Sequence, residues 1–220
     1  MSLPRHETKT AAKHQFERWA HSYDRSVLQR LVFGPSYRAF LEELVRWRLG
    51  NPEPFEMLDV GCGTGSWPAM VAATTLPARR IVGLDYAFTM CRLAEEKVRA
   101  IGDSRLQFLN GDSEHLPFPN ASFDLVTCSN SFHHYPHQAD VVREFRRVLR
   151  PGGRLMIIDG FRDNLIGWVT FDVLVTRAEG RVFHAPWSMM RQFFTDAGFG
   201  QVSQRKFNIW IPLFLTVGVA

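Results

Sequence analysis

Apolar residues recur at helical spacing at two places near the start of the chain: Phe16, Trp19, Ala20 and Tyr23, then Phe40, Leu41, Leu44, Val45 and Trp47. Residues three or four positions apart share one face of a helix, so this spacing predicts a helical segment over residues 12–49. The Phe-Gly-Pro-Ser sequence at 33–36 contains two residue types that interrupt helices. We therefore predict two or three helices, broken around 33–36.

From residue 57 the pattern changes to short apolar strands that alternate with helices. Strands are expected at 57–60, 81–85, 106–109, 123–128 and 154–159, and helices at about 66–75, 89–101 and 141–149. Pro-Gly-Gly at 151–153 is expected to end the last of these helices. Alternation at this spacing predicts an α/β fold, with a parallel sheet covered by helices on both faces.

Residues 189–220 follow a different pattern. A helix over 189–197, capped by Gly198, precedes two strands at 201–208 and 213–219. Their connection is too short for a crossover, so the two strands must pair antiparallel. Neither a repeat nor a linker divides the chain, which predicts a single domain.

A glycine-rich loop, Asp59-Val60-Gly61-Cys62-Gly63-Thr64-Gly65, joins the first expected strand to a helix. Glycines let the chain turn sharply and let a ligand approach the backbone, and the helix start beyond them offers free N–H groups. The alternative is a tight strand-to-helix turn with no ligand. The loop alone does not decide between the two.

Acidic residues at the ends of the strands favour a nucleoside-containing cofactor. Asp85 ends the second strand, 20 residues after Gly65, where Rossmann-like folds place an acid that binds ribose hydroxyls. Asp59 would repel a pyrophosphate but attract a cofactor that carries an ammonium and a sulfonium. Asp112, after the third strand, could accept a hydrogen bond from an adenine amino group.

The sequence resembles the class I S-adenosylmethionine-dependent methyltransferases, especially the branch with quinone and sterol methyltransferases. The resemblance rests on five stretches in the expected order: Leu58–Gly65, Gly83–Asp85, Gly111–Phe118, Phe123–Val126 and Leu149–Arg154. It implies a Rossmann-like, seven-stranded, mostly parallel sheet whose last strand is antiparallel. It also implies a helical cap at 12–49, a cofactor-binding core at 55–159, a substrate-lid insert at 160–188 and a C-terminal helix with a strand pair at 189–220.

The same resemblance suggests where S-adenosylmethionine would bind. In that family the glycine loop lies against the amino-acid half of the cofactor, the acid matching Asp85 holds the ribose, and the residue matching Asp112 contacts adenine. For Met90 a core position is an alternative to cofactor contact. The expected cofactor-binding residues are Tyr23, Asp59, Gly61, Cys62, Gly63, Gly65, Asp85, Tyr86, Met90, Gly111, Asp112, Ser113, Ser129 and Asn130.

The segment after the fourth strand, residues 129–135, should lie beside the reacting methyl group. His133 or His134 could act as a general base, since imidazole titrates near neutral pH; alternatively, both cap or pack the loop. No metal site is expected. Asn130 is followed by Ser-Phe instead of two prolines and an aromatic residue, which disfavours N-methylation of DNA or of glutamine amides.

The acceptor is expected to be a small, partly apolar or aromatic molecule. The insert at 160–188 is rich in aromatic residues, which could cover a planar acceptor or could simply form the core of a helical lid: Phe161, Trp168, Phe171, Phe183, His184 and Trp187. Three alternatives stay open: a cofactor-binding regulatory protein without catalysis, an RNA methyltransferase, and a nicotinamide-dependent oxidoreductase.

Composition narrows the partners only slightly. The net charge is +4 with a pI near 9.2, and the densest basic cluster, residues 143–154, falls at a helix end, so nucleic acid is not favoured as a partner. Three cysteines without CxxC spacing indicate reduced thiols and a cytoplasmic protein. Residues 1–16 lack a signal-peptide core, and the longest apolar run, 209–220, is shorter than the ~20 residues of a membrane span.

Overall fold

The computed structural model describes residues 27–49, 53–163, 167, 170, 182–208 and 211–220. Its centre is a seven-stranded sheet with strand order β3-β2-β1-β4-β5-β7-β6. The strands are β1 (Phe55–Val60), β2 (Ala78–Asp85), β3 (Leu106–Asn110), β4 (Phe123–Ser129), β5 (Leu149–Gly160), β6 (Gly200–Phe207) and β7 (Leu213–Val219). Only β7 pairs antiparallel with its neighbours β5 and β6, as predicted.

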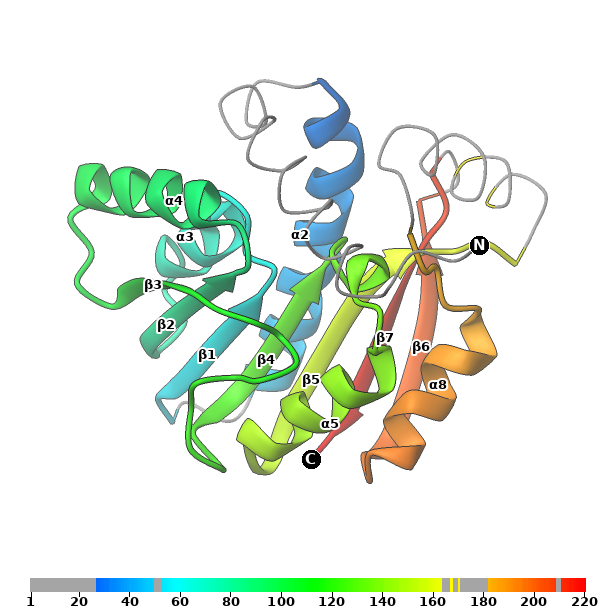
Figure 1. Cartoon of the computed structure of the whole chain (residues 1–220). Helices are drawn as coiled ribbons and strands as arrows, with labels where there is room; N and C mark the ends of the chain where they lie inside the picture. The colour runs from blue at the N-terminus through cyan, green and yellow to red at the C-terminus, as the bar shows by residue number, and fades with distance from the viewer. Residues whose placement is uncertain (1–26, 50–52, 164–166, 168–169, 171–181, 209–210) are drawn as a thin grey trace.

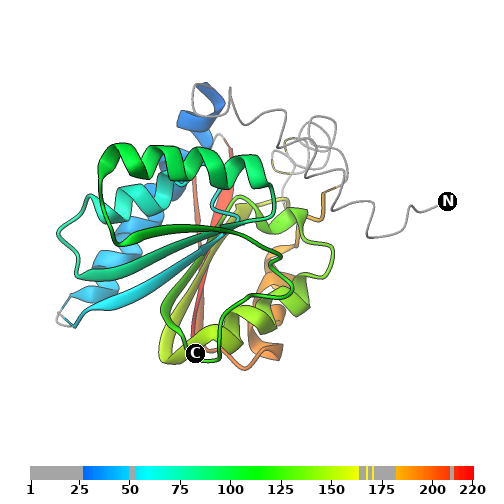
Figure 2. The ribbon, with the colours of Figure 1, turned by 60° about the vertical axis from the view of Figure 1, so that its left-hand side comes forward.

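Helices cover both faces of this sheet (Figures 1 and 2). One face carries α2 (Val27–Arg48), α3 (Ser66–Ala72) and α4 (Phe88–Ile101), and the other carries α5 (Gln138–Val148) and α8 (Trp187–Asp196). Successive strand residues point to opposite faces, so Met57 packs under the first set of helices and Leu58 under the second. Such two-sided burial explains why the central strands β1 and β4 are almost continuously apolar.

The predicted break at 33–36 was wrong, because α2 runs without interruption from Val27 to Arg48 with Pro35 inside it. Proline removes one backbone hydrogen bond and costs about 3 kcal/mol in a helix interior. Phe40 and Leu44 on the same helix are completely buried against the sheet, and such burial contributes about 1.5–3 kcal/mol for each large side chain. Tertiary packing therefore offsets the local preference to break.

The Pro-Gly-Gly segment at 151–153 was predicted to end a helix, but it lies within strand β5. Helix α5 ends at Val148, before this segment, and β5 begins at Leu149 and includes it. The pairing of β4 with β5 shifts here, from Phe123 opposite Leu149 to Leu125 opposite Arg154. The glycines thus form an irregularity within the strand.

Two further predictions concern the chain as a whole. Cys62, Cys91 and Cys128 are buried free thiols, as expected. Among the described helices, none has the length and apolar character needed to cross a membrane. The apolar run near the C-terminus forms β7, the strand predicted there.

Candidate active site

A cleft opens at the carboxyl ends of β1, β2 and β4, where the strand order reverses direction. In open α/β sheets ligands bind at such a switch point. The non-atom space in and in front of the cleft, open solvent included, is about 990 Å³. It is lined by Phe33, Tyr37, Asp59, Val60, Gly61, Cys62, Gly63, Thr64, Trp67, Leu84, Asp85, Tyr86, Ala87, Met90, Gly111, Asp112, Ser113, Ser129, Asn130, Ser131, His134 and Tyr135.

The glycine loop forms the floor of this cleft. Gly61 has a φ of +73°, and a Cβ there would lie 2.1 Å from Ser131 Oγ and 2.8 Å from Tyr135 Oη. No other residue type fits both the backbone conformation and the space. The loop and the 131–135 segment therefore approach each other more closely than any side chain at position 61 would permit.

Gly65 has a different role from Gly61 and Gly63. It is absent from the described lining, and a Cβ on it would lie 2.6 Å from Phe108 Cζ. Its φ of +73° turns the chain into α3. The third glycine thus allows close packing of the helix start on β3.

Asp59 is a buried carboxylate that faces the cleft. It is 3% exposed, and its Oδ1 accepts a 2.7 Å hydrogen bond from Thr127, which in turn accepts one from Trp67 Nε1. Burial raises the pKa of Asp59 to about 7; the charge of Asp85 adds to this effect, and the Thr127 hydrogen bond opposes it. A carboxylate that is costly to ionise in a ligand-free site is complementary to a cationic ligand.

Asp85 is fixed by the backbone at the end of β2. Its Oδ2 accepts a 2.8 Å hydrogen bond from the N–H of Gly63, and its Oδ1 accepts a 2.9 Å bond from the N–H of Ala87. Burial raises its pKa, and these backbone hydrogen bonds oppose the rise. Each carboxylate oxygen keeps a second lone pair, so the side chain can still accept hydrogen bonds from a diol.

Asp112 completes the acidic set on the β3 side of the cleft. Its Oδ1 accepts a 3.0 Å hydrogen bond from the N–H of Glu114, which fixes the turn after β3. Gly111 and Ser113 line the cleft beside it. The three carboxylates therefore come from three strand ends and share one cleft, an arrangement that fits a ligand with a cation at one end and a nucleoside at the other.

Known proteins resemble this chain in both sequence and structure. A family model described as a methyltransferase domain matches residues 58–157. Demethylmenaquinone methyltransferase of Listeria welshimeri is 36% identical over 165 residues, which cover 74% of this chain and 68% of the relative. The chain belongs to the class I S-adenosylmethionine-dependent methyltransferases, in their quinone-methyltransferase-like branch.

Solved structures confirm the fold of this methyltransferase. A SAM-dependent methyltransferase of Thermotoga maritima aligns with a TM-score of 0.72 at 18% identity, covering 94% of this chain and 98% of that one. The [4+2]-cyclase SpnF aligns with a TM-score of 0.67 at 20% identity, covering 81% and 79%. Because a cyclase shares the architecture, the fold alone does not determine the reaction.

The structure separates the two histidines that the sequence placed together. His134 lines the methyltransferase's cleft, whereas His133 lies beneath it, 6% exposed. His133 Nδ1 lies 2.6 Å from Asp159 Oδ1, and its ring centroid lies 4.2 Å from that of His134, with the two ring planes tilted by 50°. His134 is therefore the one with access to a ligand.

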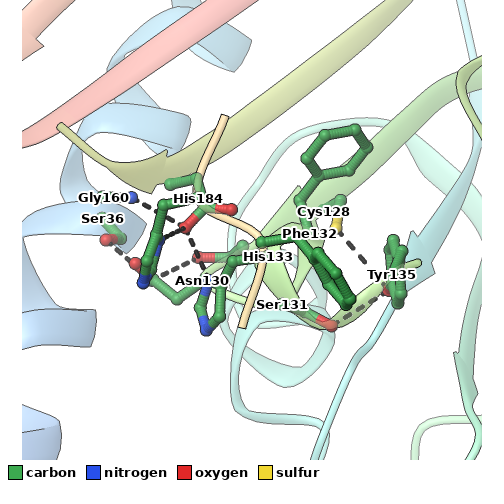
Figure 3. Close-up of polar contacts among 12 residues, drawn as sticks. Ser36, Cys128, Asn130, Ser131, Phe132, His133, Tyr135, Gly160 and His184 are labelled. Carbon is green, nitrogen blue, oxygen red and sulfur yellow. Dashed lines mark hydrogen bonds and ion pairs between the residues drawn. The ribbon is translucent and has the colours of Figure 1, made fainter. Parts of the chain in front are cut away.

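Asn130 connects the cleft to α2. It has a φ of +50°, and its Nδ2 donates 3.0 Å hydrogen bonds to Ser36 Oγ and Ser129 Oγ (Figure 3). Tyr23, a further expected site residue, lies outside the described residues. Apart from Tyr23 and Gly65, the expected cofactor residues line the cleft, including Cys62, Tyr86 and Met90, of which Met90 is 1% exposed.

The cleft also has an aromatic wall that the sequence motifs did not predict. Phe33 and Tyr37 lie one helical turn apart on α2, with ring centroids 6.0 Å apart, and Tyr37 stacks on Trp67 of α3 at 6.0 Å and 21°. Their four-residue spacing was the available signal. The predicted break at 33–36 concealed it, because it assigned Phe33 and Tyr37 to different elements.

Proposed function

We propose that this methyltransferase binds S-adenosylmethionine in the cleft and transfers its methyl group to a small, planar acceptor of the quinol class. The convergence of Asp59, Asp85 and Asp112 on one cleft, with Asp59 buried, is the observation that carries the cofactor assignment. When bound, S-adenosylmethionine supplies an electrophilic methyl group on a sulfonium.

Each end of the cleft suits one part of that cofactor. Asp59 and the N–H groups of the loop at Gly61 and Gly63 would hold the amino-acid end. Asp85 would accept hydrogen bonds from the ribose hydroxyls, and Asp112 from the adenine amino group. The attraction between Asp59 and the cofactor's cation offsets the free-energy cost of ionising a buried carboxylate.

The acceptor class is supported by the aromatic wall and by the relatives. Phe33, Tyr37 and Trp67 offer flat apolar surfaces, on which a planar ring packs favourably. The relatives that cover most of this chain carry the name demethylmenaquinone methyltransferase. We propose that His134, on the described wall of the cleft, contacts the acceptor.

Calorimetry and a transfer assay together test this proposal. S-adenosylmethionine is expected to bind the full chain, and NAD and NADP are expected not to bind. With methyl-labelled cofactor, label should enter a reduced demethylmenaquinone but should not enter bulk RNA. Tight nicotinamide binding would overturn the cofactor assignment, and transfer to RNA alone would overturn the acceptor class.

A variant at position 134 separates binding from turnover. His134→Ala is expected to keep the dissociation constant for S-adenosylmethionine and to lower kcat by about 10²–10⁴-fold if the imidazole takes part in proton transfer. Unchanged kcat and KM for the acceptor would remove His134 from the proposal without affecting the cofactor site.

A further inference from the structure

Three buried side chains meet at the carboxyl end of β5, next to the cleft. They are His133 in the short 3₁₀ turn η1 (Phe132–His134), Asp159 in β5 and His184 in the segment before α8, and they are 6%, 3% and 4% exposed. One potential metal-ligand atom from each lies within 4.8 Å of the others. His184 Nδ1 lies 3.8 Å from Asp159 Oδ1, and the two imidazole rings are 4.5 Å apart (Figure 3).

The backbone around the cluster holds the two histidines in place. The N–H of Phe183 donates a 2.7 Å hydrogen bond to the carbonyl of His133. Gln138 Nε2 donates to the carbonyls of Phe132 and Phe183, at 3.1 and 2.6 Å. The segment that carries His184 is therefore joined to the turn that carries His133, so the side chains meet in a defined geometry.

The carboxylate at the centre has one oxygen unused. Asp159 Oδ1 accepts hydrogen bonds from His133 and from the N–H of Gly160, at 2.6 and 2.7 Å. Asp159 Oδ2 is buried and has no hydrogen-bond partner in the described part of the chain. Burying a carboxylate oxygen without a partner costs free energy. An ion that binds to the oxygen is one ordinary explanation for such an arrangement.

The three side chains are of the types that bind divalent ions. Their potential ligand atoms are a carboxylate oxygen and imidazole nitrogens, and all three residues are buried. The cluster thus presents a carboxylate and two imidazoles inside one buried space.

We propose that His133, Asp159 and His184 bind one divalent transition-metal ion, such as zinc or ferrous iron, through two imidazole nitrogens and a carboxylate oxygen. Mixed imidazole and carboxylate ligands suit these ions, whereas calcium and magnesium prefer oxygen ligands alone. Three protein ligands leave one coordination position for water or another molecule. The site does not depend on the identity of the methyl acceptor.

The proposed metal site lies apart from the cofactor site, so metal binding and cofactor binding should be independent. An ion there would tie the segment before α8 to β5 and would lie behind the His133–His134 turn, of which His134 lines the cleft. Metal loading should therefore leave the affinity for S-adenosylmethionine unchanged.

No metal site was expected from the sequence, because 26 positions separate His133 from Asp159 and a further 25 separate Asp159 from His184.

Titration with cobalt tests the proposal without any enzymatic assay. The full chain without a histidine tag is dialysed against a chelator, and Co²⁺ is then added while the visible spectrum is recorded. One ion per chain should bind, with the intense d–d bands of a low-coordinate site, and Zn²⁺ should displace it. Elemental analysis of the protein before chelation provides an independent measure of bound metal.

Three variants assign the ion to this cluster. Loss of a residue that only supports a metal ligand weakens metal binding by about 10–100-fold. His184→Gln and Asp159→Asn each remove a ligand itself, so each should weaken Co²⁺ binding by more than this. His137→Gln is the matched control, since His137 also lies beside an acid, 3.0 Å from Glu114, but outside the cluster. It should bind Co²⁺ as the wild type does.

Circular dichroism and the affinity for S-adenosylmethionine show whether each variant is folded. If Asp159→Asn does not fold, His184→Gln and the wild-type spectrum still decide. The proposal is overturned if the wild type binds no stoichiometric ion, or if a folded variant binds Co²⁺ like the wild type. The three residues would then be a hydrogen-bonded cluster without metal.

Discussion

The buried carboxylate of Asp59 predicts opposite effects on stability and on ligand binding. Burial raises its pKa from 3.8 to about 7, and at 1.36 kcal/mol per pKa unit this shift corresponds to about 4 kcal/mol. An acid whose pKa rises on folding contributes stability that is complete below its unfolded pKa and is lost as pH rises through the folded pKa. The ligand-free protein should therefore become less stable between pH 4 and pH 8, roughly.

Asp59→Asn isolates this effect, because the amide oxygen can still accept the hydrogen bond from Thr127. Between pH 5 and pH 8, the wild type should lose about 3 kcal/mol of unfolding free energy that the variant keeps. Urea unfolding of both proteins at the two pH values measures the difference. The variant should also bind S-adenosylmethionine more weakly, since it cannot offer a negative charge to the cation.

One result would refute this reasoning about Asp59. If the stability difference between wild type and variant were the same at pH 5 and pH 8, the carboxylate would not titrate in this range. Asp85 contributes a pH effect of the same sign, since burial raises its pKa as well. Comparing the variant with the wild type cancels most of that contribution.

Three further substitutions test the packing of the site. Gly61→Ala places a methyl group 2.1 Å from Ser131 Oγ. Calorimetry should show weaker cofactor binding, and the free energy of unfolding should fall by at least about 1–2 kcal/mol. Wild-type values in both measurements would contradict the described packing of the loop. Thr127→Val removes the hydrogen bond that lowers the pKa of Asp59. The free energy of unfolding should fall by about 1–3 kcal/mol, and the pH at which stability declines should be higher than in the wild type. A decline at the same pH would contradict the role of the Thr127 hydroxyl. Tyr37→Ala should raise KM for the acceptor while the dissociation constant for S-adenosylmethionine changes little; the reverse pattern in steady-state kinetics and calorimetry would assign Tyr37 to the cofactor.

Much of the fold could be predicted because its strands are short, apolar and regularly spaced. The parallel sheet follows from that spacing, and the antiparallel pairing of β6 with β7 follows from a connection too short for a crossover. Two segments differ from the prediction: the Pro-Gly-Gly segment, which lies inside β5, and α2, where Pro35 suggested a break. The burial of Phe40 and Leu44, which decides the outcome, depends on contacts with the sheet that no local pattern contains.

The candidate site was predictable where it depends on the backbone. Asp59 and Asp85 lie at the ends of their strands and Asp112 lies just after its strand. These strand ends meet at one edge of the sheet, so the shared cleft follows from topology. The sequence did not reveal that Gly65 faces Phe108 and not the cleft. It also could not reveal that His133 lies beside Asp159 and His184, because these residues are distant in the chain and meet only through packing.

A crystal structure with S-adenosylhomocysteine tests the central claim most directly. The account predicts that the product occupies the cleft, with Asp85 hydrogen-bonded to the ribose hydroxyls, Asp112 near the adenine amino group and Asp59 near the amino-acid end. A ligand bound elsewhere, or one in the cleft whose ribose lies away from Asp85, would contradict it.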